Sequence, residues 1–250
     1  MDTSVIKADV TVALGFLKMC HVVQPGALLC GDVSVLNIGI PSHLREGFNL
    51  DSITETMVAS LLPERPDFSH KGMFGKLLVV GGSENFIGAP TLASGAAYRS
   101  GTGLVTVACQ RSIASTLLSL SPEATLLQME ETSNGVIDGW RSAIGMTQVL
   151  DNYSAMLVGC GLGINSEKYK LIRNLILSGL KGPPIIIDAD GLNLIAKLYK
   201  WWERMPDEVI LTPHLREMSR LTGLPIDEIQ SDPCLLYTSD AADERSSVDL

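Results

Sequence analysis

Residues 76–90 have the sequence Lys76-Leu-Leu-Val-Val-Gly-Gly-Ser-Glu-Asn-Phe-Ile-Gly-Ala-Pro90, and this stretch decides the fold. It begins with a short, almost continuously apolar run, as expected of a β-strand that is buried on both faces. Glycines follow at once, and Pro90 suits the first turn of a helix that we expect to run to about Ser100. The stretch therefore predicts a strand, a glycine-rich turn and a helix.

The same alternation continues along the chain. Four more apolar runs have the character of buried strands: Leu104–Ala108, Ala155–Gly159, Pro184–Asp188 and Val209–Leu211. Segments with helical patterns of roughly 10 to 15 residues separate such runs in proteins with parallel sheets. The pattern predicts an α/β protein with a mostly parallel sheet and helices on both faces. Ligands of such sheets bind beyond the carboxyl ends of the strands, so we expect the functional residues there.

Composition limits the function classes. The chain has 250 residues, 46% of them apolar and 19% charged, which is typical of a protein with a core. No run approaches the roughly 18 to 20 apolar residues that span a bilayer, and the start does not resemble a signal peptide, so we expect a cytoplasmic protein. The net charge of −9 argues against nucleic acid as a partner. The five cysteines and the histidines lack the spacing of a metal site.

Both ends of the chain differ from its middle. The apolar segments Val10–Leu14 and Val33–Ile40 are too few to close a sheet, so residues 1–45 are interpreted as the end of a preceding domain. Residues 46–70 are interpreted as a linker with a helix over Ser52–Leu62, for which Asp51 is a candidate cap. After Pro233 the alternation stops, and the charged end predicts disorder.

Two glycine clusters follow predicted strands. Gly81-Gly82-Ser83 and Gly88-Ala89-Pro90 flank a strand-to-helix turn whose backbone N–H groups can approach a phosphate or another anion. The cluster Gly159-Cys160-Gly161-Leu162-Gly163 can line the same crevice from a neighbouring strand. The alternative for the first cluster is a tight turn without a ligand, and for the second it is a flexible turn. The first cluster matches neither a dinucleotide-binding fingerprint nor a P-loop.

Polar side chains end two other strands. Asp188, Asp190 and Asn193 suit a sugar hydroxyl, a magnesium ion or a water molecule, and the alternative for Asp190 is helix capping. His214 can hydrogen-bond a ligand, or it can cap the helix that follows. We expect that helix to end at Gly223.

Taken together, these motifs resemble the NAD(P)H-hydrate dehydratase family in order and spacing. The segments that carry the resemblance are His70-Lys71-Gly72-x-x-Gly75-Lys76, Gly81-Gly82-Ser83, Gly88-Ala89-Pro90, Ala97–Ala108, Ile187–Asn193 and Leu211-Thr212-Pro213-His214. The resemblance covers roughly residues 68 to 230. Residues 8–12 and 37–41 resemble the last strands of the NAD(P)H-hydrate epimerase domain that often precedes the dehydratase. The parent protein is thus expected to be bifunctional.

The resemblance implies a ribokinase-like fold and a repair reaction. Phosphate from ADP, or from ATP in eukaryotic relatives, is transferred to the C6 hydroxyl of hydrated NADH or NADPH and then eliminated. By position, Ala89, Gly161 and His214 would contact the hydrated nucleotide, with Asn193 and Asp188 nearby. Gly81, Gly82, Ser83 and Gly88 would contact a phosphate or shape the loop. Magnesium is expected with the phosphate donor, and the intact protein is expected to be a homo-oligomer.

The chain departs from the family pattern in three places. Leu215-Arg216 replaces a Pro-Gly pair, and Cys160 replaces a proline. The family's catalytic aspartate is expected beyond Gln230, and nothing in the last twenty residues matches its segment. We expect residues 71–233 to be the first part of the dehydratase domain, and residues 234–250 to be a non-native tail similar to a translated sequencing adapter. The chain as written is then expected to bind weakly without turnover.

Two alternatives stay open at this point. A ribokinase-like kinase of a small alcohol would share the fold and differ in its acceptor pocket. A nucleotide-binding fragment without catalysis would share the loops and lack a base. ATP-dependent phosphorylation of a vitamin precursor would favour the first alternative, and a genuine tail would favour the second.

Overall fold

The computed structural model describes residues 5–45, 51–133, 135–177, 179 and 182–231. The chain divides into two compact units, Met1–Leu62 and Pro63–Leu250. The expected tail over residues 234–250 lies outside the described residues and stays a prediction. The proposed domain limits at residues 45, 70 and 233 also stay predictions.

The first unit contains a small parallel sheet. Strands β1 (Val10–Leu14) and β2 (Asp32–Leu36) pair in register, with Val10 opposite Asp32. The second strand is therefore shorter than the predicted Val33–Ile40. The other elements of this unit are α1 (Met19–Val22), α2 (Glu55–Leu61) and the 3-10 helices Gly26–Leu29 and Ser42–Arg45.

The prediction that Asp51 caps α2 was wrong. Helix α2 begins three residues later than expected, and its N-cap is Thr54, whose hydroxyl accepts a hydrogen bond from the Met57 amide over 3.2 Å. A threonine hydroxyl can accept a hydrogen bond from one of the first free amides of a helix, so a carboxylate is not needed here.

The second unit is built on a parallel sheet in which the described residues form six strands, in the order β5-β4-β3-β6-β7-β8. The strands are β3 (Lys76–Val80), β4 (Leu104–Cys109), β5 (Thr125–Gln128), β6 (Ala155–Val158), β7 (Ile185–Ile187) and β8 (Val209–Leu211). All five predicted strands are present, and the predicted parallel sheet is confirmed. Strand β5 was missed because it has only four residues with a polar one at each end, which leaves too short an apolar run.

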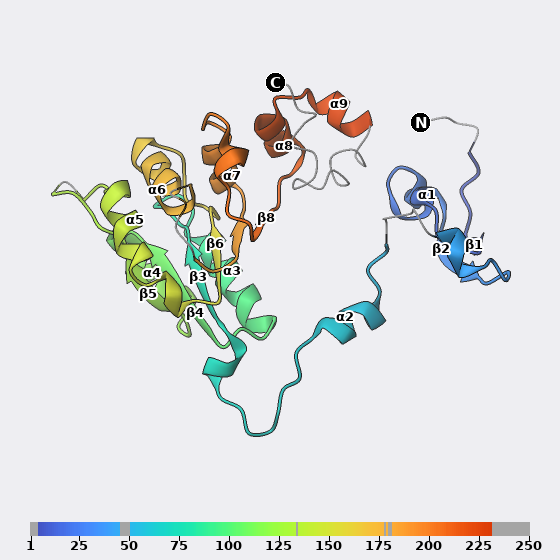
Figure 1. The fold of residues 1–250 in the computed structure, drawn as a ribbon, viewed down its shortest axis with the longest axis horizontal. Coiled ribbons are helices and arrows are strands. Elements are labelled where there is room, and N and C mark those ends of the chain that lie inside the picture. The colour runs from blue at the N-terminus through green and yellow to red at the C-terminus, as the bar shows by residue number, and fades with distance from the viewer. Residues whose placement is uncertain (1–4, 46–50, 134, 178, 180–181, 232–250) are drawn as a thin grey trace. The chain divides into compact units, whose positions relative to one another are not determined.

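Helices cover both faces of this sheet (Figure 1). They are α3 (Gly88–Arg99), α4 (Arg111–Leu120), α5 (Gly139–Thr147), α6 (Ser166–Ile176), α7 (Asp190–Ile195), α8 (Leu215–Thr222) and α9 (Ile226–Ser231). Short 3-10 helices span Lys71–Phe74, Leu150–Asn152 and Trp201–Arg204. Helix α8 ends at Gly223 in the left-handed conformation, as predicted.

The sheet separates two hydrophobic cores. One packs Leu78, Val80, Met156 and Val158 against apolar residues of α5, α6 and α7. The other packs alternate residues of β3 and β4 against α3 and α4. Since side chains alternate between the faces of a strand, this pattern is the expected result of burial on both sides.

The second face is covered unevenly. Helices α3 and α4 lie over β3, β4 and β5, whereas the same face of β6, β7 and β8 carries Leu157, Ile186 and Ile210. Leu157 and Ile186 are half-buried, and Ile210 is 60% exposed. This partly open region borders the functional crevice.

Candidate functional site

The loops after β3 and β6 touch each other at the carboxyl edge of the sheet. The Gly82 amide donates to the Cys160 carbonyl over 3.0 Å, and the Ser83 hydroxyl donates to the Gly161 carbonyl over 2.9 Å. A Cβ atom at Gly81 would lie 2.4 Å from the Cys160 oxygen, so no larger residue fits there. The two glycine clusters therefore pack against each other, and this packing alone requires glycine at position 81.

The loop after β6 also meets the end of β7. A Cβ atom at Gly159 would lie 2.0 Å from the Asp188 carbonyl oxygen, and its φ of +119° favours glycine independently. Beyond it, the Asp190 carboxylate accepts a hydrogen bond from the Gly163 amide over 2.7 Å. Asp190 is the first residue of α7 and Ala189 occupies the N-cap, so the alternative that Asp190 caps this helix is wrong. Its carboxylate joins the start of α7 to the loop after β6 instead.

Asp188 lies between two hydrogen-bond donors. The Thr212 hydroxyl, after β8, donates to Oδ1 over 3.0 Å, and the Cys160 thiol, after β6, donates to Oδ2 over 3.5 Å. Burial, followed by the Asp188 charge, raises the pKa of the Cys160 thiol to about 12. The thiol therefore keeps its proton at neutral pH and acts as a donor.

These groups open onto a cavity of about 580 Å³. One wall is the face of α3 that carries three alanines and Leu92, beginning at Ala89, and the other wall follows β6, β7 and β8 to their carboxyl ends. Of the predicted substrate contacts, Ala89, Gly161 and Asp188 line it, together with Cys160 and Thr212. The cavity is mostly apolar with a few polar groups, as is typical of sites for organic ligands.

The four predicted loop residues lie beside this cavity and do not line it. Gly81, Gly82 and Ser83 are buried where the two glycine loops touch, and Gly88 is the exposed first residue of α3. A Cβ atom at Gly161 would lie 2.7 Å from the Phe86 carbonyl oxygen and 2.9 Å from the Ala89 Cβ atom, so the loop after β6 packs closely against the loop after β3 and the start of α3. Contacts of these residues with a phosphate remain a prediction.

The other two predicted substrate contacts do not line the cavity described here. His214 is the N-cap of α8: its Nδ1 accepts from the amides of Arg216 and Glu217, over 3.1 and 3.4 Å. The Glu217 carboxylate in turn accepts from the His214 amide over 3.0 Å, which completes a capping box. Asn193 accepts a hydrogen bond from the Arg220 guanidinium. The capping alternative for His214 is thus confirmed, and its role toward a ligand stays a prediction.

Sequence reasoning missed one buried charge near the glycine loops. Lys168 is 94% buried on α6, and a Cβ atom at Gly163 would lie 3.1 Å from its ammonium nitrogen. Burial lowers the pKa of Lys168, while the charges of Asp190 and Glu84 oppose this shift. Its place one turn inside a helix, among polar neighbours in sequence, gave no signal of burial.

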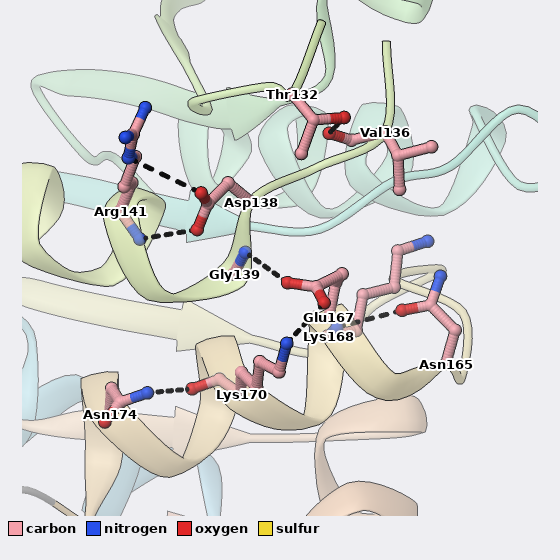
Figure 2. Close-up of polar contacts among 10 residues, drawn as sticks. All are labelled: Thr132, Val136, Asp138, Gly139, Arg141, Asn165, Glu167, Lys168, Lys170 and Asn174. Carbon is pink, nitrogen blue, oxygen red and sulfur yellow. Dashed lines mark hydrogen bonds and ion pairs between the residues drawn. The ribbon is translucent and has the colours of Figure 1, made fainter. Parts of the chain in front are cut away.

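Polar contacts cap the starts of α5 and α6, and one of them joins the two helices (Figure 2). Asn165 caps α6 by accepting from the Lys168 amide over 2.9 Å, and Asp138 caps α5 in the same way. Glu167 accepts from the Gly139 amide over 3.1 Å and from the Lys170 ammonium over 2.6 Å. The hydrogen bond from Gly139 to Glu167 adds to the apolar packing between α5 and α6.

Two further observations concern metals and membranes. In the described part of the chain, no group of three or more His, Cys, Asp or Glu side chains is placed to hold a metal ion. No helix among the described residues is both long and apolar enough to cross a membrane.

Comparison with known proteins shows which family the chain resembles in sequence. The family model for NAD(P)H-hydrate dehydratase matches residues 77–248, which extends beyond the limit near residue 230 that the motifs predict. A bifunctional NAD(P)H-hydrate repair enzyme from Thermofilum pendens is 35% identical over 226 residues, 90% of this chain and 42% of that protein. An ADP-dependent (S)-NAD(P)H-hydrate dehydratase from Staphylococcus aureus is 35% identical over 70% of this chain and 58% of its own length.

Solved structures agree with the predicted fold. The ADP/ATP-dependent NAD(P)H-hydrate dehydratase from Bacillus subtilis, co-crystallised with ATP and Mg²⁺, is 32% identical with a TM-score of 0.58, over 73% of this chain and 60% of that one. A ribokinase-like superfamily protein from Enterococcus faecalis is 26% identical with a TM-score of 0.54, over 66% of this chain and 54% of that one. The chain therefore spans less than two thirds of each of these relatives. Its motifs, its sheet and these matches show that the chain belongs to the NAD(P)H-hydrate dehydratase family.

Proposed function

We propose that this chain forms part of an enzyme that dehydrates hydrated NADH and NADPH, with ADP or ATP as the phosphate donor. The observation that carries the proposal is the cavity at the carboxyl ends of β6, β7 and β8, where Ala89, Gly161 and Asp188 meet. The family resemblance implies that five residues lie at the hydrated nucleotide, and these are three of them. The Staphylococcus aureus and Bacillus subtilis relatives carry the same activity in their names.

The chain's own residues suit the parts of such a ligand. The small side chains of α3, including Ala89 and Ala93, leave room for a flat ring against an apolar wall. Asp188 can accept a hydrogen bond from a ligand hydroxyl or amide group. Gly161, which lines the cavity, places no side chain there.

We include a phosphate donor and Mg²⁺ in the proposal because a relative was crystallised with both. The Bacillus subtilis structure was obtained with ATP and Mg²⁺. In the described part of this chain the acidic side chains do not gather into a metal site, so we assign no residue to Mg²⁺. Magnesium commonly reaches nucleotide enzymes bound to the phosphates with only one or two carboxylates of the protein.

The parent protein is proposed to be bifunctional, cytoplasmic and homo-oligomeric. The Thermofilum pendens relative is named bifunctional, and its match covers 90% of this chain, too much for the dehydratase-like unit alone. We assign residues 1–45 to the end of an epimerase domain and residues 46–70 to a linker. Light scattering on the parent protein would test the oligomer, and an assay that converts one epimer of hydrated NADH to the other would test the second activity.

The first experiment measures binding and turnover separately. Calorimetry of the 250-residue chain with hydrated NADH tests the cavity, and the absorbance of restored NADH in the presence of ADP or ATP tests catalysis. We expect Asp188→Asn to weaken binding roughly 10- to 100-fold, because a hydrogen bond to a charged acceptor is lost. The matched control is Asp207→Asn, at an exposed carboxylate before β8 and thus at the opposite edge of the sheet.

Two results would contradict the proposal. Absence of binding by the wild-type chain would remove hydrated NADH as its ligand. ATP-dependent phosphorylation of a small vitamin-precursor alcohol, with no effect on hydrated NADH, would favour the kinase alternative. Binding without turnover would fit a chain that carries the substrate pocket and leaves the phosphate transfer to the rest of the parent protein.

A further inference from the structure

Asp188 is held from both sides by the ends of neighbouring strands. Strand β7 lies between β6 and β8, and each neighbour supplies one donor, the Cys160 thiol to Oδ2 and the Thr212 hydroxyl to Oδ1. A carboxylate has about four acceptor positions, two on each oxygen. Each oxygen of Asp188 therefore has one internal donor and retains one position for another partner.

All three side chains line the same cavity. The last torsion of an aspartate side chain has a broad energy well, so the carboxylate plane is free to turn unless neighbours hold it. Two donors on opposite oxygens restrict that rotation before any ligand arrives. A preorganised acceptor binds a ligand more tightly than a mobile one, because less freedom is lost on binding.

We infer that Cys160 and Thr212 are positioning residues that orient the Asp188 carboxylate toward an N–H or O–H donor of the ligand in this cavity. The inference rests on the proposed function, which supplies the ligand, a hydrated nicotinamide nucleotide.

The protonation of Cys160 supports this role. Burial makes the largest contribution to the raised pKa of the thiol, followed by the charge of Asp188 and the hydrogen bond to it, and the charge of Asp190 acts in the same direction. The thiol is therefore a donor throughout the neutral range, and its protonation reports on the carboxylate beside it. The contact can thus be tested without any ligand.

The first test measures the alkylation rate of each thiol by iodoacetamide at pH 9.0, the ordinary thiol pKa, with peptide mass spectrometry. Asp188→Asn removes the neighbouring charge, so we expect Cys160 to react several-fold faster. Cys109 is the matched internal control, since its pKa is also raised, to about 11, by burial and by the charge of Glu131. An unchanged Cys160 rate, or equal acceleration of both thiols, overturns the contact.

The second test measures the affinity for hydrated NADH by calorimetry. Cys160→Ala and Thr212→Val should each weaken binding about 3- to 10-fold, the usual effect of one hydrogen bond. Cys160→Ser and Thr212→Ser keep a donor and should stay within about 2-fold of wild type. In an Asp188→Asn background, Cys160→Ala should cause no further loss. The inference is overturned if the serine variants lose as much affinity for hydrated NADH as the alanine and valine variants do.

The two tests separate this inference from the proposed function. If wild type does not bind hydrated NADH, the proposed function fails, and the alkylation rates still decide whether the contact exists. If the wild-type chain binds hydrated NADH and the serine variants do not keep the wild-type affinity, the proposed function stands and the positioning role is wrong. Should Asp188→Asn not fold, the comparison of serine with alanine at residue 160 decides alone.

Discussion

At the scale of single residues, the site depends on close backbone approaches that only glycine allows. We predict that Gly159→Ala destabilises the chain by about 3 kcal/mol or more, because the new methyl group would overlap the Asp188 carbonyl and φ is unfavourable. Gly95→Ala is the control, since Gly95 lies inside α3 with open space around its Cβ position. There alanine should stabilise by about 0.5 to 1 kcal/mol. Urea denaturation of both variants measures the difference.

A second residue prediction concerns alkaline pH. Burial, then the charge of Glu131, raises the pKa of Cys109 from 9.0 to about 11. In the unfolded chain the thiol ionises near its ordinary value, so between these two values the folded state holds a proton that the unfolded state has released. The free energy of unfolding should therefore fall as the pH rises through this window, by up to about 1.4 kcal/mol per pH unit for one thiol.

The prediction is checked by the slope of the free energy of unfolding against pH. The slope is used because a substitution in the core also changes the free energy of unfolding itself at every pH. Cys109→Ala should flatten the slope above pH 9.0 even if it lowers stability at every pH. Cys20→Ala, at an exposed thiol, should leave the slope as in wild type. A Cys109→Ala slope equal to that of wild type would show that this thiol ionises normally in the folded chain.

At the scale of elements, two variants of His214 can distinguish its role as a helix cap from a contact with the ligand. We expect His214→Asn to keep α8 stable, because asparagine is among the best N-cap residues, and His214→Ala to cost about 1 kcal/mol. If the imidazole also contacts the hydrated nucleotide, both variants lose affinity equally. Thermal melts and calorimetry on the same two proteins measure the two effects, and full affinity in His214→Asn would remove His214 from the binding site.

The elements also show which structural features could be predicted from the sequence and which could not. Strands β3, β6, β7 and β8 were predictable because each is an apolar run that ends in glycine or a polar residue, and their parallel order brings those ends together. The contact between Cys160 and Asp188 was not predictable, since it joins residues 28 apart through the pairing of β6 with β7. The burial of Lys168 was hidden for the same reason, because its neighbours come from other elements.

At the scale of the whole molecule, apolar surface is the dominant feature. Large apolar side chains are exposed in both units, for example Val10 at 61% and Leu14 at 53% on β1, and Ile210 at 60% on β8. A two-stranded sheet buries too little surface to be stable alone, and β8 is an edge strand in the described sheet. Exposed apolar side chains on a small sheet and on an edge strand favour association with other chains.

We therefore predict that the purified 250-residue chain binds a hydrophobic dye and self-associates in solution. Ile210→Lys should reduce association without a large loss of stability, because the side chain is mostly exposed and a charge on an edge strand opposes strand pairing. Glu208→Gln, just before β8, is the matched control for the change in net charge, because it also raises the charge by one and replaces no apolar side chain. Light scattering and dye fluorescence against concentration measure the effect. A monomeric chain with a sharp, reversible two-state melt and no dye binding would show that these apolar side chains do not drive association.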